Sequence, residues 1–346
     1  MTVIALDVGG TELKGAVVAE DGTVLQTERW LTRSGRGAGA VVDTVLGRAA
    51  DLVELARRAG TPPRAAGVVV PGLVDEATGT VRRAVNLDWQ DVPIRAWLAE
   101  HLGLPVAFGH DVRAGGLAEA RLGAGRGSAS FVFVPVGTGI AAAVMTDGRA
   151  VTGALGAAGE LGHLTVRPGG DRCACGGRGC LETVASAGAI ARRYEHRTGL
   201  PGVGADEVHR RSAAGEPAAV EVWTEAVEAL ADGLTATVTL LDPERIVIGG
   251  GLARAGEDLL GPLATALAAR LAFRTAPRLV AAELGHRAGC LGAALLARDL
   301  LEREVPEGPV PEGSVPEGSP LVREAPEREA PGREVPAQNP PTGGSS

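Results

Sequence analysis

The sequence predicts an α/β protein with two domains. Its 346 residues are enough for two ordinary domains with additional segments. Short apolar runs bounded by turn residues, which are typical of buried strands, alternate with helical patterns along the chain. Three glycine turns, at residues 9–10, 137–139 and 249–251, each follow such a strand pattern. Together, these observations indicate an α/β architecture in which glycine turns lie at strand ends.

Composition places the chain among globular proteins and argues against nucleic-acid binding. Hydrophobic residues make up 45% of the chain and charged residues 22%, which is normal for a soluble protein. The net charge is −8, whereas surfaces that bind nucleic acids are basic. No apolar run is long enough to span a membrane, and residues 1–6 lack the positive charge of a secretory signal. We therefore expect a cytoplasmic protein that binds neither nucleic acids nor membranes.

The pattern in the first 122 residues predicts three strands, which are followed by helices and strands in alternation. Residues 3–6, 15–19 and 23–30 are expected to form a twisted hairpin and a third strand, because glycine-containing turns separate them. Segments with helical periodicity follow at residues 41–59, 93–102 and 114–122. Apolar runs that predict buried strands lie between these helices, at residues 65–70 and 106–108.

The second part of the chain repeats this alternation. Strands are expected at residues 130–135, 139–146 and 245–248. Between them, residues 153–179 are rich in glycine and are expected to be mostly irregular. Helical patterns are found at residues 186–194, 218–241, 258–272 and 288–302.

A glycine turn near the start of the chain is a candidate phosphate-binding loop. Asp7-Val8-Gly9-Gly10-Thr11 separates two strand patterns and is followed by Lys14. Glycines let the backbone approach a phosphate, and Asp7 would organise the magnesium shell of a nucleotide through water. Taken alone, the motif fits an ordinary hairpin turn equally well. Together with Gly137-Thr138-Gly139 and Gly249-Gly250-Gly251, it matches the two phosphate turns and the adenosine turn that a kinase cleft needs.

Four motifs together resemble the ROK family, which contains repressors and sugar kinases such as bacterial glucokinases. They are Asp7-Val8-Gly9-Gly10-Thr11, His110-Asp111, Gly159-Glu160-Leu161-Gly162-His163 and Cys173-Ala174-Cys175-Gly176-Gly177-Arg178-Gly179-Cys180-Leu181-Glu182. The resemblance covers roughly residues 2–300. It implies the actin/hexokinase/Hsp70-like (ribonuclease H-like) fold, in which two α/β domains close over a cleft.

The resemblance also implies how the chain is divided. Residues 1–112 would form a small α/β domain, and a helix at residues 287–302 would pack back against this domain. Residues 113–286 would form a larger α/β domain with a zinc-binding loop. In the remaining residues, 303–346, the sequence Val-Pro-Glu-Gly begins at positions 305, 310 and 315. A segment dominated by Pro, Glu and Gly cannot bury enough apolar surface to offset its ordering entropy, so we expect a disordered tail.

Three cysteines and one histidine form a candidate zinc site. Cys173, Cys175 and Cys180 have the spacing Cys-x-Cys-x4-Cys, and His163 precedes them. One imidazole and three thiolates are a common tetrahedral zinc set that leaves no open position for chemistry. A reduced cysteine cluster or a disulfide is the alternative, although a cytosolic setting favours a metal. We therefore expect a structural zinc ion, and we expect the distant Cys290 to be a small buried side chain.

The resemblance assigns five residues around the sugar. Glu160 and Glu182 would contact sugar hydroxyls, which suits carboxylates because they accept several hydrogen bonds. His163 would reach the sugar with the ring nitrogen that does not bind zinc. Gly72 would let the backbone come close to the sugar, and Asn86 would lie beside it. Asn86 also fits an ordinary turn residue, and both interpretations stay open at this point.

Asp111 is the candidate catalytic base, because phosphoryl transfer to a hydroxyl needs a proton acceptor. Without the resemblance, its place before a helix pattern favours a helix cap instead. His110 and Arg113 depart from the family pattern, which usually has Asn at both positions. The neutral ring of His110 offers one donor and one acceptor, so it could replace Asn beside the sugar. These departures bear on the choice of sugar more than on the reaction.

The predicted function is transfer of a phosphoryl group from ATP with Mg²⁺ to the 6-hydroxyl of a hexose, glucose first, by a homo-oligomer (dimer or tetramer). Alternatives within this class are N-acetylmannosamine, N-acetylglucosamine, fructose or allose as the acceptor, and polyphosphate as the donor. A sugar-responsive regulator of the ROK type is another alternative. Only six residues precede Asp7, so we expect no helix-turn-helix domain there. A sugar-binding protein with an inactive kinase fold is the third alternative.

Overall fold

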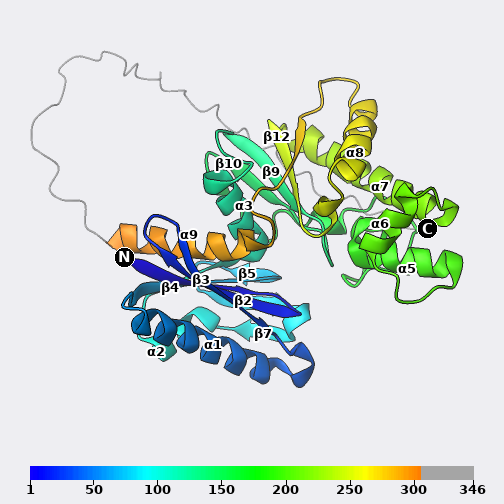
Figure 1. Cartoon of the computed structure of the whole chain (residues 1–346). Helices are drawn as coiled ribbons and strands as arrows, with labels where there is room; N and C mark the ends of the chain where they lie inside the picture. Colours follow the sequence, from blue (N-terminus) through cyan, green and yellow to red (C-terminus); the bar gives the residue numbers. More distant parts are fainter. Residues whose placement is uncertain (305–346) are drawn as a thin grey trace, which may run out of the picture. The chain divides into compact units, whose positions relative to one another are not determined.

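The computed structural model describes residues 1–304, whose strands form two five-stranded sheets and one three-stranded sheet (Figure 1). The first large sheet has the order β3-β2-β1-β4-β8, with β1 (Thr2–Val8), β2 (Glu12–Ala19), β3 (Val24–Leu31), β4 (Pro63–Val70) and β8 (Val106–His110). The second has the order β11-β10-β9-β12-β13, with β9 (Ser130–Pro135), β10 (Ala143–Thr146), β11 (Arg149–Ala150), β12 (Arg245–Gly249) and β13 (Arg278–Ala281).

Both large sheets follow one mixed pattern. Strands β1, β2 and β3 pair antiparallel, and β4 and β8 extend the sheet in parallel from β1. In the same way, β9, β10 and β11 pair antiparallel, and β12 and β13 extend that sheet in parallel from β9. At least one helix precedes each added parallel strand, as a crossover connection requires. This duplicated unit is the predicted two-sheet α/β architecture.

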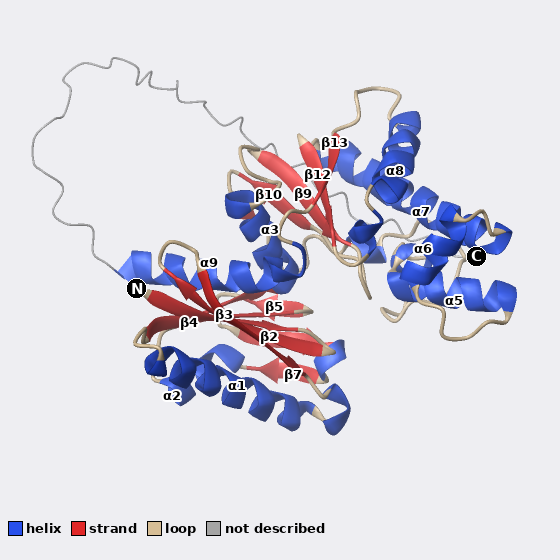
Figure 2. Cartoon of the chain, in the orientation of Figure 1, coloured by secondary structure: helices blue, strands red, loops and turns tan. Residues whose placement is uncertain are grey.

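Helices cover both faces of the first sheet (Figure 2). Helices α1 (Ala38–Arg58) and α2 (Ile94–Leu102) lie on one face, and α9 (Ala288–Glu304) lies on the other. Successive residues of a strand point to opposite faces, and β1 is buried on both. Ile4 and Leu6 therefore pack with α1 and α2, whereas Val3 and Ala5 pack with α9.

The second sheet is covered by the remaining helices. Its larger core lies under α4 (Glu182–Ala185), α5 (Ala187–Thr198), α6 (Ala205–Ala213), α7 (Pro217–Leu241) and α8 (Glu257–Arg270). On the other face, Phe131 and Phe133 of β9 pack against Leu117 of α3 (Asp111–Leu122). Residues Leu291 and Leu295 of α9 belong to the same cluster, so α9 packs against both large sheets.

Several predicted elements are confirmed within a few residues, and others are corrected. Residues 139–142, predicted as part of a strand, are irregular, and the helix predicted at 186–194 continues to Thr198. Seven strands and α-helices were not predicted: β5 (Leu73–Asp75), β6 (Thr80–Ala84), β7 (Trp89–Val92), β11, β13, α4 and α6. Of these, β5, β6 and β7 form the small sheet, in that order.

Two predictions made from the sequence stay predictions. The division of the chain at residues 112 and 287 stays a prediction, and the disordered tail lies outside the described residues. Among the described helices, none is long and apolar enough to cross a membrane.

Candidate active site

One cavity brings together five residues that the sequence assigns to the sugar. It has a volume of about 440 Å³, and its lining includes Gly72, Asn86, Glu160, His163 and Glu182. These residues come from segments far apart in the chain, so the fold supplies the proximity. His110 and Asp111 are not among the residues that line it. Asn86 belongs to a single 3₁₀ turn, Val85–Leu87, which leaves its side chain beside the first glycine turn.

The predicted metal ligands lie together. The ligand atoms of His163, Cys173, Cys175 and Cys180 are all within 4.8 Å of one another. His163 Nδ1 lies 3.6 Å from Cys173 Sγ, and Cys175 Sγ lies 3.7 Å from Cys180 Sγ. All of these cysteines are free of disulfides. The predicted alternative of a disulfide is therefore not what the structure contains.

The chemistry of this cluster fits a thiophilic divalent cation. Burial and the neighbouring thiols raise the pKa of Cys180 to about 12, while the Gly177 amide lowers the pKa of Cys175. Three crowded sulfurs resist joint ionisation without a cation, and a bound metal removes that conflict. The loop closes sharply behind them, because a side chain at Gly179 would meet the carbonyl oxygen of Arg167 at 1.7 Å.

His163 connects the metal cluster to the cavity. Its Nδ1 faces Cys173, and its Nε2 lies 3.8 Å from Glu160 Oε2. The short 3₁₀ segment Leu161–His163 that carries it packs closely on the chain at Ile140, since a side chain at Gly162 would lie 2.1 Å from the Ile140 carbonyl oxygen. Nδ1 therefore faces the metal cluster, and Nε2 is the ring nitrogen that the sequence analysis expects to reach the sugar.

Glu182 connects the same cavity to the second glycine turn. It is the first residue of α4 and follows the last cysteine of the cluster closely. One of its carboxylate oxygens accepts a hydrogen bond of 3.0 Å from the Ile140 amide. That oxygen is also 2.7 Å from the position a side chain would take at Gly139, so any side chain there would displace the Glu182 carboxylate. The other oxygen of Glu182 stays available to a ligand in the cavity.

The glycine turns are placed by strand pairing. In the first turn, a side chain at Gly10 would meet Asn86 of the cavity at 2.8 Å. The second and third turns follow β9 and β12, which run in parallel and pair at Pro135 and Gly249. Gly250 has a φ of +76° and the Leu252 amide donates to the Val136 carbonyl oxygen, so these two turns are neighbours. The first turn borders the sugar cavity directly, and the second does so through Glu182.

Asp7, Lys14 and Asp111 form one electrostatic group. Asp7 and Lys14 pair across the β1–β2 hairpin, and Lys14 Nζ lies 3.3 Å from Asp7 Oδ2. Burial raises the pKa of Asp7 to about 6; Lys14 opposes this rise and the Asp111 charge adds to it. Burial likewise raises the pKa of Asp111 to about 6, against the opposing effects of the Val112 amide, Arg113 and Lys14. Two carboxyl groups thus titrate close to neutral pH beside one cation.

The junction of β8 and α3 shows how Asp111 is placed at the start of its helix. His110, not Asp111, is the capping residue, because its Nδ1 accepts a hydrogen bond of 3.2 Å from the Val112 amide. Asp111 is the first residue of the helix, and its Oδ1 also accepts from Val112 at 2.7 Å. Since Nδ1 of His110 acts as an acceptor, the ring proton lies on Nε2. Burial, aided by Arg113, lowers the pKa of His110 to about 4, so the ring is neutral.

Sequence reasoning missed Glu76, which holds this junction in place. Its Oε1 accepts from Arg113 Nε at 2.9 Å and from the His110 amide at 3.3 Å. Arg113 is buried and also donates to the Gly156 carbonyl oxygen at 3.0 Å. Glu76 lies 37 residues before Arg113, so no local signal in the sequence joins them. Arg113, which departs from the family pattern, thus ties α3 to two loops near the sugar cavity.

Comparison with known proteins agrees with this architecture. The family model described as ROK family matches residues 3–300. A glucokinase of Thermotoga maritima is 36% identical over 317 residues, covering 86% of this chain and 98% of its own. The crystal structure of a ROK family glucokinase from Streptomyces griseus in complex with glucose and AMPPNP has a TM-score of 0.77 at 30% identity, covering 86% of this chain and all of that one.

A regulator has the same fold. A ROK family transcriptional regulator, a homologue of the Escherichia coli MLC protein, has a TM-score of 0.79 at 25% identity. That match covers 86% of this chain and 78% of the regulator. The fold alone therefore does not separate kinases from regulators, and the residues of the site carry the functional argument. The predicted fold class is confirmed, and the chain belongs to the ROK family.

Proposed function

We propose that this protein is an ATP-dependent hexose kinase that phosphorylates the 6-hydroxyl of its substrate, with glucose as the first candidate. The observation that carries the proposal is Asp111, a half-buried carboxyl group with a pKa of about 6 beside Asp7 and Lys14. A regulator needs no such group, whereas a kinase needs a proton acceptor for the attacking hydroxyl. The similarity to glucokinases supports the same reaction class.

In this proposal the residues divide the work between two substrates. Gly72, Asn86, Glu160, His163 and Glu182 bind the sugar in the 440 Å³ cavity. His110, which lies outside the lining of that cavity, would add a donor through Nε2 when the sugar is bound. The three glycine turns, with Thr11 and Thr138, surround the nucleotide. Asp111 takes the proton of the attacking hydroxyl, and Lys14 offsets negative charge near the transferred phosphoryl group.

Two metals have separate places. Asp7 would hold the shell of a nucleotide-bound Mg²⁺, which neutralises charge on the phosphates. The cluster of His163 and the three cysteines would hold a structural zinc ion, which has no open position in such a ligand set. The metal-binding loop then has a positioning role. It holds Nε2 of His163 beside Glu160, and it holds Glu182, which lies two residues after Cys180.

The test is a coupled ADP-release assay with Mg-ATP against glucose, mannose, fructose, allose and the N-acetylhexosamines. We expect one hexose, glucose first, to give a dominant rate. A dominant rate with an N-acetylhexosamine keeps the reaction and moves the specificity. A second arm replaces ATP with polyphosphate and measures the sugar phosphate formed. Sugar binding without turnover in either arm would refute the kinase proposal in favour of a non-catalytic sugar-binding protein.

A further inference from the structure

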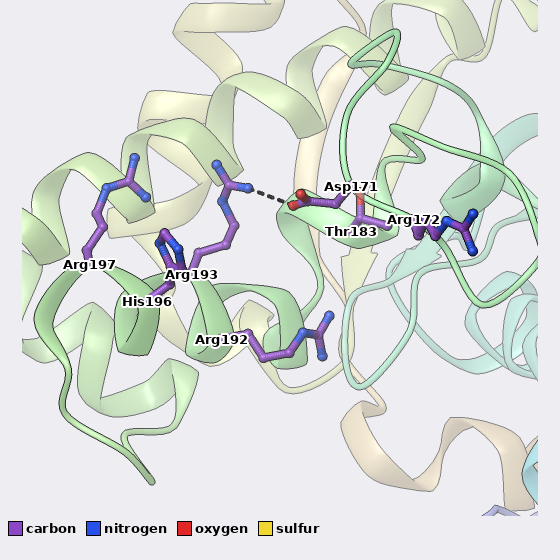
Figure 3. A pocket seen from close by; sticks show the side chains of 7 residues that line it. All are labelled: Asp171, Arg172, Thr183, Arg192, Arg193, His196 and Arg197. Atoms are coloured by element: carbon purple, nitrogen blue, oxygen red, sulfur yellow. Dashed lines mark hydrogen bonds and ion pairs between the residues drawn. The ribbon is translucent and has the colours of Figure 1, made fainter.

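A second cavity, of about 650 Å³, lies outside the proposed site and is dominated by arginine (Figure 3). It lies between α5 and the start of the metal-binding loop. Its lining residues are Asp171, Arg172, Thr183, Arg192, Arg193, His196 and Arg197. The sugar and nucleotide assignments use none of them, so the role of this cavity needs a separate argument.

Two of its four arginines are neutralised internally. Arg193 donates to Asp171 at 3.2 Å, which Figure 3 marks, and to Glu225 at 2.6 Å. Arg197 forms ion pairs with Glu225 and, at 3.3 Å, with Glu221. These guanidinium groups have a structural explanation and do not need a ligand.

The other two arginines have no such explanation. Within residues 1–304, Arg172 and Arg192 form no ion pair and no side-chain hydrogen bond that the structure describes. Figure 3 shows the guanidinium group of Arg192 ending away from the labelled carboxylate of Asp171. The Nε atom of Arg193 is buried and lacks a partner among the described residues.

The metal-binding loop adds a like-charge conflict. Arg172 and Arg178 face each other across an antiparallel bridge, and like charges in that position destabilise a strand pair. Among residues 1–304, the side chain of Arg178 donates only to the Gly170 carbonyl oxygen, at 3.5 Å. Surface arginines are common in this chain, where Lys14 is the sole lysine among 34 basic residues. Placing two of them opposite each other without a counter-charge is not explained by composition.

The cavity also adjoins the second glycine turn. Arg192 Nη1 lies 3.2 Å from the position a side chain would take at Gly188, and the Thr138 carbonyl oxygen lies 4.0 Å from the same position. The Ala187 amide at the start of α5 donates to the Gly137 carbonyl oxygen at 2.8 Å. Because residue 188 has no side chain, the guanidinium group of Arg192 lies over the start of α5, on the side of the second glycine turn.

We propose that this cavity is an anion site that binds a phosphate group of a small ligand, with Arg172 and Arg192 as its free cations. A guanidinium group can donate two parallel hydrogen bonds to a phosphate. Two guanidinium groups carry two positive charges, which match the two negative charges of a phosphate dianion better than the single charge of a carboxylate. The phosphate could belong to an inorganic polyphosphate chain or to a phosphorylated sugar. The inference does not depend on the kinase proposal, because it rests on residues outside that site.

The experiment is isothermal titration calorimetry of the full chain, first saturated with Mg-AMPPNP so that the cleft is occupied. Tripolyphosphate and glucose 6-phosphate are titrated separately, each premixed with Mg²⁺. We expect one site for at least one of them. Arg192→Gln and Arg172→Gln should each weaken its binding about tenfold, because each removes a charge-assisted hydrogen bond. Arg57→Gln is the matched control: it removes one positive charge from an exposed position on α1 and should leave the affinity unchanged.

The preferred ligand identifies the source of the phosphate. Tighter binding of tripolyphosphate indicates a polyphosphate chain, and tighter binding of glucose 6-phosphate indicates a phosphorylated sugar. Failure of both ligands to bind would overturn the proposal, as would equal affinity in Arg192→Gln, Arg172→Gln and Arg57→Gln. Circular dichroism confirms that each variant is folded, and none of these measurements requires turnover. An inactive kinase therefore leaves the test of this site intact.

Discussion

Asp111 is the residue at which reactivity and stability oppose each other most clearly. Its pKa, raised by burial to about 6, means that the ionised base forms only above that pH. Turnover should therefore rise as the pH passes through about 6 and then level off. Asp7, whose pKa is also about 6, titrates in the same range. The rise should be steeper than that of a single group, which a pH profile of kcat measures directly.

Asp111→Asn should separate the two effects. Turnover should fall by about 10²–10⁴-fold while sugar binding persists, because the variant lacks the proposed base. A carboxyl group whose folded pKa exceeds its unfolded value of 3.8 destabilises the folded state above pH 6 and not below about pH 4. The variant should therefore gain on the order of 2–3 kcal/mol in free energy of unfolding at pH 8, and little at pH 4.

Urea unfolding at both pH values measures this gain, and the ADP-release assay measures the loss of turnover. Asp147→Asn, in the exposed β10–β11 turn, is the control and should change neither. Near-normal turnover in Asp111→Asn would remove Asp111 from the role of base.

The ion pair of Glu76 and Arg113 makes a second prediction for single residues. Glu76→Gln leaves the guanidinium of Arg113, a residue only 4% exposed, without its counter-charge. Uncompensated buried charges are costly, so we expect a loss of about 2–3 kcal/mol in free energy of unfolding. Arg113→Gln should cost a similar amount, and the double variant should cost clearly less than the sum.

A double-mutant cycle in urea tests this coupling. Glu54→Gln, which breaks the exposed pair with Arg58 on α1, is the control and should cost at most about 0.5 kcal/mol. Strictly additive losses at Glu76 and Arg113 would show that the two residues do not stabilise each other.

Among the elements, the sequence predicted those that bury a regular apolar face. Helix α7 buries twelve residues, and its predicted and observed bounds differ by one residue. Helix α6 is short and polar and buries only Ala205 and Val208, so few apolar residues mark it in the sequence. Strand β6 has charged residues at Arg82 and Arg83 and exists because it pairs with β5 and β7. Such pairing depends on the fold and is not visible in a local pattern.

The residues of the site also differ in whether a local pattern can predict them. The metal ligands are close in sequence, and the cysteine spacing together with the family resemblance predicted the cluster that the structure contains. Glu76 acts from a distant segment and could not be found. The capping role of His110 was also missed, because histidine is not a preferred cap and its Nδ1 serves here only through the geometry of the β8–α3 junction.

The metal-binding loop gives a prediction for an element without regular structure. Cys175→Ser should reduce zinc content to well below one per chain and destabilise the loop, because metal-binding energy is folding energy in such a segment. Elemental analysis measures the zinc, and limited proteolysis measures the loop. Cys290→Ala, which changes a buried thiol outside the cluster, is the control and should keep its zinc. A full complement of zinc in Cys175→Ser would contradict the proposed ligand set.

At the scale of the whole molecule, α9 links the two large sheets. It packs on β1 and β4 of the first sheet, and its leucines join the core beneath the second. The approach is close enough to demand glycine at two places. A side chain at Gly67 would lie 1.9 Å from the Ala293 carbonyl oxygen, and one at Gly292 would lie 2.1 Å from the Ala114 carbonyl oxygen. The second contact joins α9 to α3, the helix that begins at Asp111.

Gly292→Ala should therefore disturb stability and activity together. The added methyl group cannot be relieved by a flexible side chain, because it meets backbone, so α9 and α3 must separate. Overpacking of this kind costs about 1–3 kcal/mol. The shift at α3 also moves Asp111 relative to Lys14, so kcat should fall while the KM for the sugar changes less.

Gly261→Ala in α8 is the matched control for this change. There, apart from the backbone of the helix itself, the atom nearest to an added side chain is the flexible end of Glu257, at 3.8 Å. Because Pro262 follows and disfavours a side chain at the preceding helical position, that variant should gain nothing from helix propensity, but it should lose less stability than Gly292→Ala and keep normal kinetics. Thermal unfolding and steady-state kinetics of the two variants make the comparison. A Gly292→Ala protein as stable and active as Gly261→Ala would show that α9 does not hold Asp111 in position.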